Sequence, residues 1–130
     1  MKKAILCLDD ERIVLESLKG QLRKNFGSEY HYEFAESAEE GYEIIEELVG
    51  EGTQILIIVS DWLMPYVKGD EFLIEVHQRF PQIVKILLSG QAAEGAIQSA
   101  VEKANLHGFI NKPWEETELV EVIKSGLAKL

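Results

Sequence analysis

The sequence predicts an α/β fold in which a five-stranded parallel sheet is doubly wound, with helices on both of its faces. Two observations predict this fold. Five short apolar segments alternate with five longer segments whose apolar residues recur every three or four positions. Strands that alternate with helices form parallel sheets, and right-handed crossovers leave few ways to connect them. Because the chain has 130 residues, about the length of one domain, we expect residues 1–130 to form a single domain.

The expected strands are short apolar or aromatic runs bounded by turn residues or charged residues. In chain order they are Ala4–Leu8, Tyr30–Phe34, Ile55–Val59, Ile83–Leu88 and Gly108–Ile110. The first, third and fourth runs are almost continuously apolar, which is typical of strands that are buried on both faces. We therefore expect these three strands at the centre of the sheet.

The expected helices have apolar residues at helical spacing. They are Arg12–Asn25, the segment that begins after Ser37, the segment that ends at Pro81, Ala93–Ala104 and Glu115–Leu130. Ser37 and Glu40 form a capping box, and Pro81 disfavours helix at the residue before it. Gly50 and Gly52 end the second helix.

Helical spacing also predicts which residues of these helices face the core. The second helix should bury Ala38, Tyr42, Ile45 and either Leu48 or Val49, and the fourth should bury Ala96, Ile97, Ala100 and Val101. In the last helix, Val120, Ile123 and Leu127 are expected either in the core or on a surface for a partner.

Composition limits the classes of partner. The chain has 13 basic and 23 acidic residues, a net charge of −10, and the segment 25–67 holds ten acids with no Lys or Arg. Such a surface argues against direct binding of nucleic acid or of an anionic membrane, and the acidic run is expected to be a solvated helix face.

The single cysteine, Cys7, excludes an internal disulfide and favours a reduced, cytoplasmic setting. The longest aliphatic run, Ile55–Val59, is too short to span a bilayer, and Asp9 follows Leu8 too soon for a signal peptide.

Polar side chains follow four of the five expected strands. The first strand is followed by Asp9 and Asp10, the third by Ser60 and Asp61, the fourth by Ser89 and Gly90, and the fifth by Asn111 and Lys112. In doubly wound sheets, ligands bind beyond the carboxyl ends of the strands. We therefore expect three carboxylates, a hydroxyl and an ammonium group at one edge of the sheet.

These residue types together indicate phosphoryl chemistry. Three carboxylates in one cleft repel each other, which raises the pKa of one of them unless a cation is bound. Oxygen ligands without a neighbouring His or Cys suit Mg²⁺. Lys112 and Ser89 would add a positive charge and a hydroxyl donor around a phosphoryl group. Asp61 is then the expected nucleophile, since a carboxylate can accept phosphate as an aspartyl phosphate.

At these positions the sequence resembles the receiver domain of two-component response regulators, and the resemblance covers the whole chain. The motifs that carry it are Asp9-Asp10, the run Asp61-Trp62-Leu63-Met64-Pro65 followed by Gly69, Ser89-Gly90, and Phe109-Ile110-Asn111-Lys112-Pro113. Each motif is short, but all of them occur in order and each lies at a strand end. The resemblance implies the flavodoxin-like strand order 2-1-3-4-5 known from chemotaxis receivers, an order that also fits five strands.

The resemblance implies a role for each acidic residue. Asp61 looks like the phosphoacceptor. Asp10 would ligate Mg²⁺ directly and Asp9 through water, and the backbone carbonyl of Leu63 would be a further metal ligand.

The resemblance also implies roles for the residues of the fourth and fifth strands. Ser89 would contact a phosphoryl oxygen, Lys112 would pair with the phosphate, and Ser89 and Phe109 would form the switch pair. The Lys112–Pro113 bond is similar to a receiver bond that is commonly cis. Leu63 and Gln91 would border the approach of water to the phosphoryl group. Because neither is a general base, the phosphorylated form is expected to be long-lived.

The implied function is that of a signalling module rather than of an enzyme with turnover. It would take a phosphoryl group from a histidine kinase or a histidine phosphotransfer protein onto Asp61. The only catalytic activities expected of the chain are its intrinsic autophosphorylation and autodephosphorylation. Phosphorylation would shift a two-state equilibrium on the face made by the helix Ala93–Ala104, the strand Gly108–Ile110 and the last helix. That face would contact an output domain or an effector protein, or form a homodimer.

The chain is expected to be either a stand-alone receiver or the N-terminal part of a larger regulator. Lys112-Pro113-Trp114 and Gly69-Asp70-Glu71-Phe72-Leu73 look like segments of receivers fused to second-messenger cyclases, phosphatases or phosphohydrolases. Trp62 and Trp114 flank the expected site, where they would either contact a partner or pack over the loops.

Two other functions share part of this pattern. Phosphohydrolases of the aspartyl-phosphate type typically carry a second Asp two residues after the nucleophile as general acid–base, whereas this chain has Leu63 there. Such enzymes also need a cap, for which the chain has little spare length. A phosphate-independent interaction domain would be favoured only if Asp61 could be removed without consequence.

Overall fold

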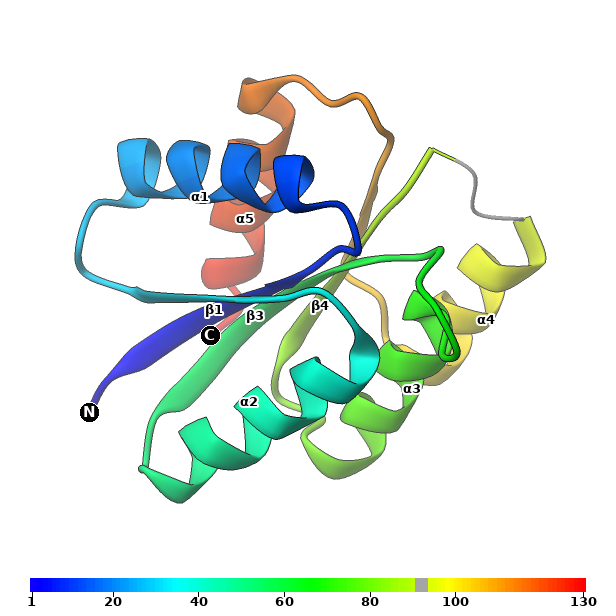
Figure 1. Cartoon of the computed structure of the whole chain (residues 1–130), viewed down its shortest axis with the longest axis horizontal. Helices are drawn as coiled ribbons and strands as arrows, with labels where there is room; N and C mark the ends of the chain where they lie inside the picture. The colour runs from blue at the N-terminus through cyan, green and yellow to red at the C-terminus, as the bar shows by residue number, and fades with distance from the viewer. Residues whose placement is uncertain (91–93) are drawn as a thin grey trace.

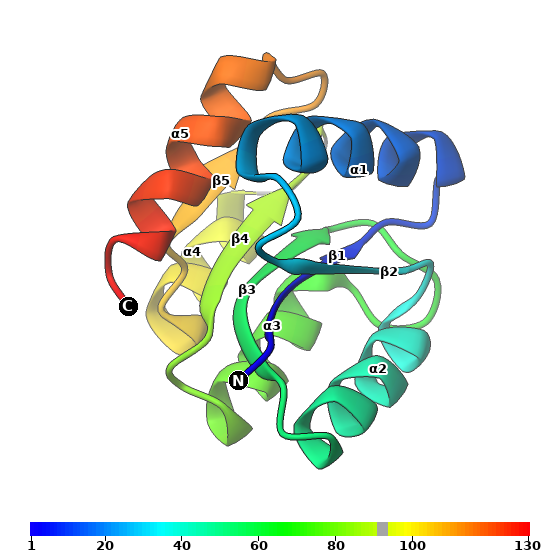
Figure 2. The same cartoon turned by 90° about the vertical axis from the view of Figure 1, so that its left-hand side faces the viewer.

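The computed structural model describes residues 1–90 and 94–130, which form a parallel five-stranded sheet (Figure 1). The strands are β1 (Lys3–Leu8), β2 (His31–Ala35), β3 (Gln54–Asp61), β4 (Val84–Leu88) and β5 (Gly108–Ile110). Their order in the sheet is β2-β1-β3-β4-β5, and every neighbouring pair is parallel (Figure 2). The predicted fold class and strand order are therefore confirmed.

Helices cover both faces of the sheet. α1 (Arg12–Phe26) and α5 (Glu116–Leu127) lie on one face, and α2 (Ala38–Gly50), α3 (Gly69–Arg79) and α4 (Glu94–Ala104) lie on the other (Figure 1). Alternate residues of the central strands enter two separate apolar clusters: Ile5 and Cys7 pack with α1 and α5, while Leu6 and Leu8 pack with α2 and α3. This alternation follows from the pleat of a strand, whose successive side chains point to opposite faces.

The cap predicted for the second helix is present. The Ser37 hydroxyl accepts a hydrogen bond from the Glu40 amide at 3.1 Å. The Glu40 carboxylate in turn accepts one from the Glu36 amide at 2.8 Å, one residue before the position that a standard capping box uses. The Lys112–Pro113 peptide bond is cis, as expected.

Burial differs from the expectation at two helices. Val101 of α4 is 47% exposed, so the prediction that it faces the core is wrong; α4 buries Ala100 and Ala104. The reason is that α4 packs chiefly against α3, so only a narrow stripe of its surface is covered. Tyr42 of α2 is only half-buried, because its ring packs on Phe72 while its hydroxyl reaches the exposed Glu75 carboxylate. Ala93, expected in the fourth helix, lies outside the described residues.

The last helix belongs to the core. Val120 and Ile123 are buried, and Leu127 packs against the cluster under α1 and α5. The two alternatives left open by the sequence are thereby decided in favour of the core for these residues. None of the described helices is long and apolar enough to cross a membrane.

Candidate functional site

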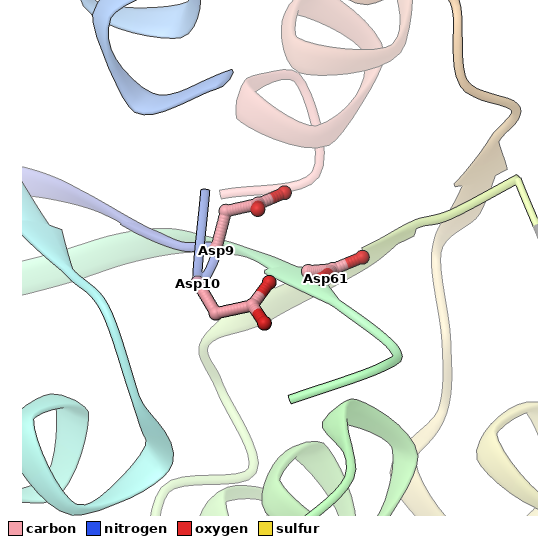
Figure 3. A group of neighbouring side chains, drawn as sticks. All are labelled: Asp9, Asp10 and Asp61. Atoms are coloured by element: carbon pink, nitrogen blue, oxygen red, sulfur yellow. The ribbon is translucent and has the colours of Figure 1, made fainter. Parts of the chain in front are cut away.

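Three carboxylates meet where β1 and β3 end (Figure 3). Asp9 and Asp10 directly follow β1, and Asp61 is the last residue of β3. One oxygen from each of the three lies within 4.8 Å of the others. Asp9 and Asp61 are buried and Asp10 is exposed, so the cluster reaches from the edge of the core to solvent. The convergence predicted from the strand ends is present for all three residues.

Lys112, in the loop after β5, lies against both buried carboxylates. Its Nζ is 2.6 Å from Asp9 Oδ2 and 3.0 Å from Asp61 Oδ1, and 3.9 Å from Glu11 Oε1. This one ammonium group compensates part of the negative charge. With Asp9, Asp10 and Asp61 all ionised, the cluster still holds two negative charges in excess of Lys112.

The pKa values follow from burial and from this imbalance. Burial, with the neighbouring Asp9 charge as the second cause, raises the pKa of Asp61 to about 6 against the opposing effect of Lys112. Burial also raises the pKa of Asp9, although Lys112 and the Glu11 amide both stabilise its charged form. Burial alone would lower the pKa of Lys112, but its hydrogen bonds to Asp9 and Asp61 outweigh burial and raise it. The site therefore carries less positive charge than its three carboxylates require.

The donor set fits a hard divalent cation. Asp9 Oδ1 accepts a hydrogen bond from the Glu11 amide at 2.9 Å. Asp9 Oδ2 is fully buried and is paired with Lys112 Nζ at 2.6 Å. The grouped ligand atoms are carboxylate oxygens only, within the described part of the chain. Oxygen ligands of this kind are the ones that Mg²⁺ prefers.

A cleft of about 610 Å³ opens above the cluster. It is lined by Asp10, Glu11, Val14, Asp61, Leu63, Ser89, Gly90, Lys112, Pro113 and Trp114. Ser89 is buried at the end of β4, and its amide donates to the Ile110 carbonyl at 3.0 Å, which ties β4 to β5 beside the cleft. The cleft thus brings the Lys112 ammonium group and Ser89 beside the carboxylate cluster.

Phe109 does not line this cleft. It lies in β5, half-buried, and packs against the apolar cluster under α2, α3 and α4. The side chain of Leu63 is 48% exposed and borders the opening. Gln91, the other residue expected beside the approach of water, lies outside the described residues.

Glu11 and Val14 also line the cleft, and neither was among the predicted site residues. Glu11 extends the acidic run after β1, which is a signal that could have indicated it, whereas Val14 enters from α1 and carries no signal in the sequence. Trp114 is packed over the loops: its indole N–H donates to Gln21 Oε1 at 2.8 Å, and its ring lies against the core cluster. Trp62 packs against the cluster on the other face.

The fold and this acidic cleft define a signal receiver domain. The family model described as "Response regulator receiver domain" matches residues 5–124, and the chain belongs to that family. It is a receiver domain of two-component systems.

Two curated relatives are much longer than this chain. The hydrogenase transcriptional regulatory protein HoxA of Cupriavidus necator is 28% identical over 95% of this chain, which covers 24% of HoxA. The sensor kinase CckA of Brucella abortus is 33% identical over 96% of this chain, which covers 12% of CckA. The chain thus spans a quarter or less of the length of these two relatives.

Solved structures of receiver domains superpose on the whole chain. A CheY-like response regulator receiver domain protein from Methanospirillum hungatei is 29% identical with a TM-score of 0.85, covering 99% of this chain and 96% of that one. The beryllofluoride-activated NtrC4 receiver domain dimer is 25% identical with a TM-score of 0.83, covering 97% of each chain.

Proposed function

We propose that Asp61 accepts a phosphoryl group from the phosphohistidine of a histidine kinase or a histidine phosphotransfer protein. The observation that carries the proposal is the under-compensated carboxylate cluster, in which Asp61 faces both a lysine and a cleft of suitable size. Mg²⁺ would be held by Asp10, Asp61 and the Leu63 carbonyl, and by Asp9 through water. When bound, it supplies positive charge to the oxygens of the transferred group.

The chain's own residues account for the transfer. The Asp61 carboxylate attacks phosphorus, an O–P bond forms, and the bond from phosphorus to the histidine nitrogen breaks with its electron pair leaving on the imidazole. The Lys112 ammonium group already pairs with the Asp61 carboxylate. After transfer it would pair with a phosphoryl oxygen, where the negative charge then lies. The Ser89 hydroxyl, buried beside the cleft, would donate to another. The lysine and the hydroxyl stabilise the charge that develops in transfer.

The switch would use Ser89 and Phe109. A hydroxyl drawn toward the phosphoryl group vacates space that the ring at the middle of β5 can enter. Because Phe109 has no hydroxyl, its inward state would be held by packing alone. Its contacts with the cluster under α4 support an output through the α4–β5–α5 face. Identical Ser89 and Phe109 rotamers in free and beryllofluoride-bound crystals would contradict this coupling.

We propose residues 1–130 as one receiver unit that acts as a phosphoacceptor rather than as a turnover enzyme. The exposed Leu63 side chain, two residues after Asp61, supports this view because it offers no general acid–base to a hydrolase. The greater length of the relatives supports an output domain or effector beyond this unit. The beryllofluoride-activated NtrC4 receiver domain is a dimer, which supports a homodimer as one form of output. For this chain we propose the α4–β5–α5 face as the surface of such a homodimer.

Intact mass measured after incubation with acetyl phosphate tests the proposal. The wild-type chain should gain one phosphoryl group with Mg²⁺ and none with EDTA, and Asp61→Asn should gain none. Glu39→Gln, which removes an exposed acid of α2, is the matched control and should behave as wild type. Beryllofluoride with Mg²⁺ should raise the Tm of the wild type by ligand linkage. A stable phosphoryl group on Asp61→Asn would show that the acceptor is another residue.

A further inference from the structure

The loop between β3 and α3 is closed by direct contact between its two ends. Its first residue, Trp62, accepts a hydrogen bond at its carbonyl from the Gly69 amide at 2.8 Å. Gly69 begins α3 and lies so close to Asp61 that an added Cβ would be 1.9 Å from the Asp61 carbonyl oxygen. The start of α3 is therefore packed against the backbone of the proposed phosphoacceptor.

The Trp62 side chain is held by the same end of α3. Its indole N–H donates to Asp70 Oδ1 at 2.9 Å, and Lys68 Nζ lies 5.0 Å from the centroid of its ring. The ring also packs against the apolar cluster on that face of the sheet. Trp62 is thus fixed at its carbonyl by Gly69, at its N–H by Asp70 and on its face by Lys68.

Trp62 lies between Asp61 and Leu63, the two residues proposed to provide metal ligands on this strand end. A backbone carbonyl has no rotatable side chain, so the direction of the Leu63 carbonyl depends on the backbone angles around it. A side chain fixed at Trp62 limits those angles before any metal binds. Groups that hydrogen-bond to metal ligands and orient them typically contribute about 10–100-fold to metal affinity.

We infer that Asp70 is a positioning residue for the cation site: it holds Trp62 and thereby presets the Asp61–Leu63 backbone for a divalent cation. The inference rests on the proposed function, because it assumes the metal site described above. Asp70 does not line the cleft and would act only through Trp62.

Asp70 is also negatively charged and lies in the first turn of α3. The effects of this charge and of this position on metal binding must be separated from the effect of the hydrogen bond to Trp62. Asp70→Asn removes the charge but keeps Oδ1 as an acceptor for the indole. Asp70→Ala removes both. Glu71→Gln removes a charge from the next residue of the same turn, which is exposed, and serves as the matched control.

Mn²⁺ titration followed by the electron paramagnetic resonance of the free ion measures the affinity without reference to phosphorylation. We expect Asp70→Ala to raise the Kd for Mn²⁺ about tenfold. Asp70→Asn should stay within about twofold of wild type because it keeps the acceptor for the indole, and Glu71→Gln should do so because the Glu71 side chain is exposed. In a Trp114→Phe background, Trp62 is the only tryptophan. Its emission should change in Asp70→Ala and not in Asp70→Asn.

The outcomes separate the two proposals. If wild type binds Mn²⁺, Asp10→Asn abolishes the binding and Asp70→Ala binds as wild type, the positioning role is wrong and the metal site stands. An equal loss in Asp70→Asn and Asp70→Ala would assign the effect to charge and would also overturn the inference. If wild type binds no Mn²⁺, or Asp10→Asn binds it equally well, the metal site itself is wrong and the inference fails with it.

Discussion

Charge is buried at two places in the described part of this molecule, and the two places differ in how that charge is compensated. At the carboxyl ends of β1 and β3, Asp9 and Asp61 share one cation, Lys112, beside an open cleft. In β4, Lys85 is 1% exposed and its Nζ lies 2.6 Å from His77 Nδ1 and 3.2 Å from the Pro81 carbonyl oxygen. Lys85 has no ion pair with a carboxylate of the described residues.

Neutral acceptors complete the Lys85 contact. Burial lowers the pKa of Lys85 to about 8. Burial, followed by the Lys85 charge, lowers the pKa of His77, which keeps the imidazole neutral and leaves Nδ1 as an acceptor for the ammonium group. The contact joins β4 to the end of α3 and to the turn that follows it.

The comparison of the two places shows when a buried charge indicates a functional site. Both places carry shifted pKa values, so a shift alone does not separate them. The carboxylate site retains an excess of one sign next to a cleft, so a ligand can complete it. The Lys85 site is completed by groups of the protein itself, and we interpret it as structural. Four predictions test this comparison.

The largest effect is expected for Lys112→Met. Without a divalent cation, this change leaves Asp9 and Asp61 buried without their shared cation and should lower the free energy of unfolding by about 4 kcal/mol. Saturating Mg²⁺ should recover part of the loss, because the cation replaces the missing charge. Urea unfolding with EDTA and with Mg²⁺ measures both values. An identical loss under the two conditions would mean that the cluster takes no cation.

The second prediction concerns pH and Lys85. Its pKa is about 8 in the folded chain against an ordinary value of 10.5, so the unfolded chain binds more protons between these values. Stability contributed by this group should therefore rise with pH from about 8 upward, by about 3 kcal/mol once pH exceeds 10.5. His77 is the titratable group in contact with Lys85, and it is already neutral throughout this window.

Lys85→Met is the reference for that rise. The free energy of unfolding of wild type should rise relative to that of Lys85→Met as pH increases from about 8 to 10, because only wild type loses the burial penalty of the ammonium group. The other titrating residues are common to both proteins and cancel in the difference. A difference that is constant with pH would contradict the lowered pKa of Lys85.

A smaller loss is expected for His77→Leu. This change removes the imidazole acceptor and leaves the buried ammonium group with the Pro81 carbonyl alone, which should cost about 2 kcal/mol near pH 7. Unlike the loss in Lys112→Met, it should not respond to Mg²⁺. Adding Lys85→Met should recover much of it, and a double-mutant cycle by urea unfolding measures that coupling. Additive effects of the two changes would show that the contact is not formed in solution.

The smallest effect is expected for Ser37→Ala, which lies at neither buried charge. Loss of the hydrogen bond from the Glu40 amide should cost about 1 kcal/mol. The loss should be equal with and without Mg²⁺ and equal near pH 7 and near pH 9. Thermal unfolding under these four conditions provides the baseline for the other variants. A dependence on Mg²⁺ here would mean that the ion acts on the fold as a whole.

Much of the candidate site could be predicted because its residues are adjacent to strand ends. Asp9, Asp10, Asp61, Ser89 and Lys112 follow or end strands that the apolar runs already indicate. In a parallel sheet those ends meet at one edge, so topology alone brings the residues together. Phe109 shows the limit of this argument: it lies within β5 rather than at its end, and it packs away from the cleft.

Contacts between elements could not be predicted in the same way. Lys85 lies inside the apolar run Ile83–Leu88, whose pattern predicts only a buried strand. Its hydrogen-bond acceptors come from α3 and from the turn after α3. The bond between Trp62 and Asp70 crosses a loop, and the exposure of Val101 depends on how α4 packs against α3. No periodicity in the chain specifies these distances.

The sequence by itself determined the alternation of strands and helices, the central position of the three apolar strands and the edge at which acids, hydroxyl and lysine gather. Local spacing and the geometry of parallel sheets are sufficient for these features, because each depends on residue order alone. The tertiary structure alone decided that Lys112 is shared by Asp9 and Asp61, that His77 accepts from Lys85 and that Asp70 holds Trp62. These features require side chains from different elements to meet within hydrogen-bond distance, and only the packing of helices on the sheet sets that distance.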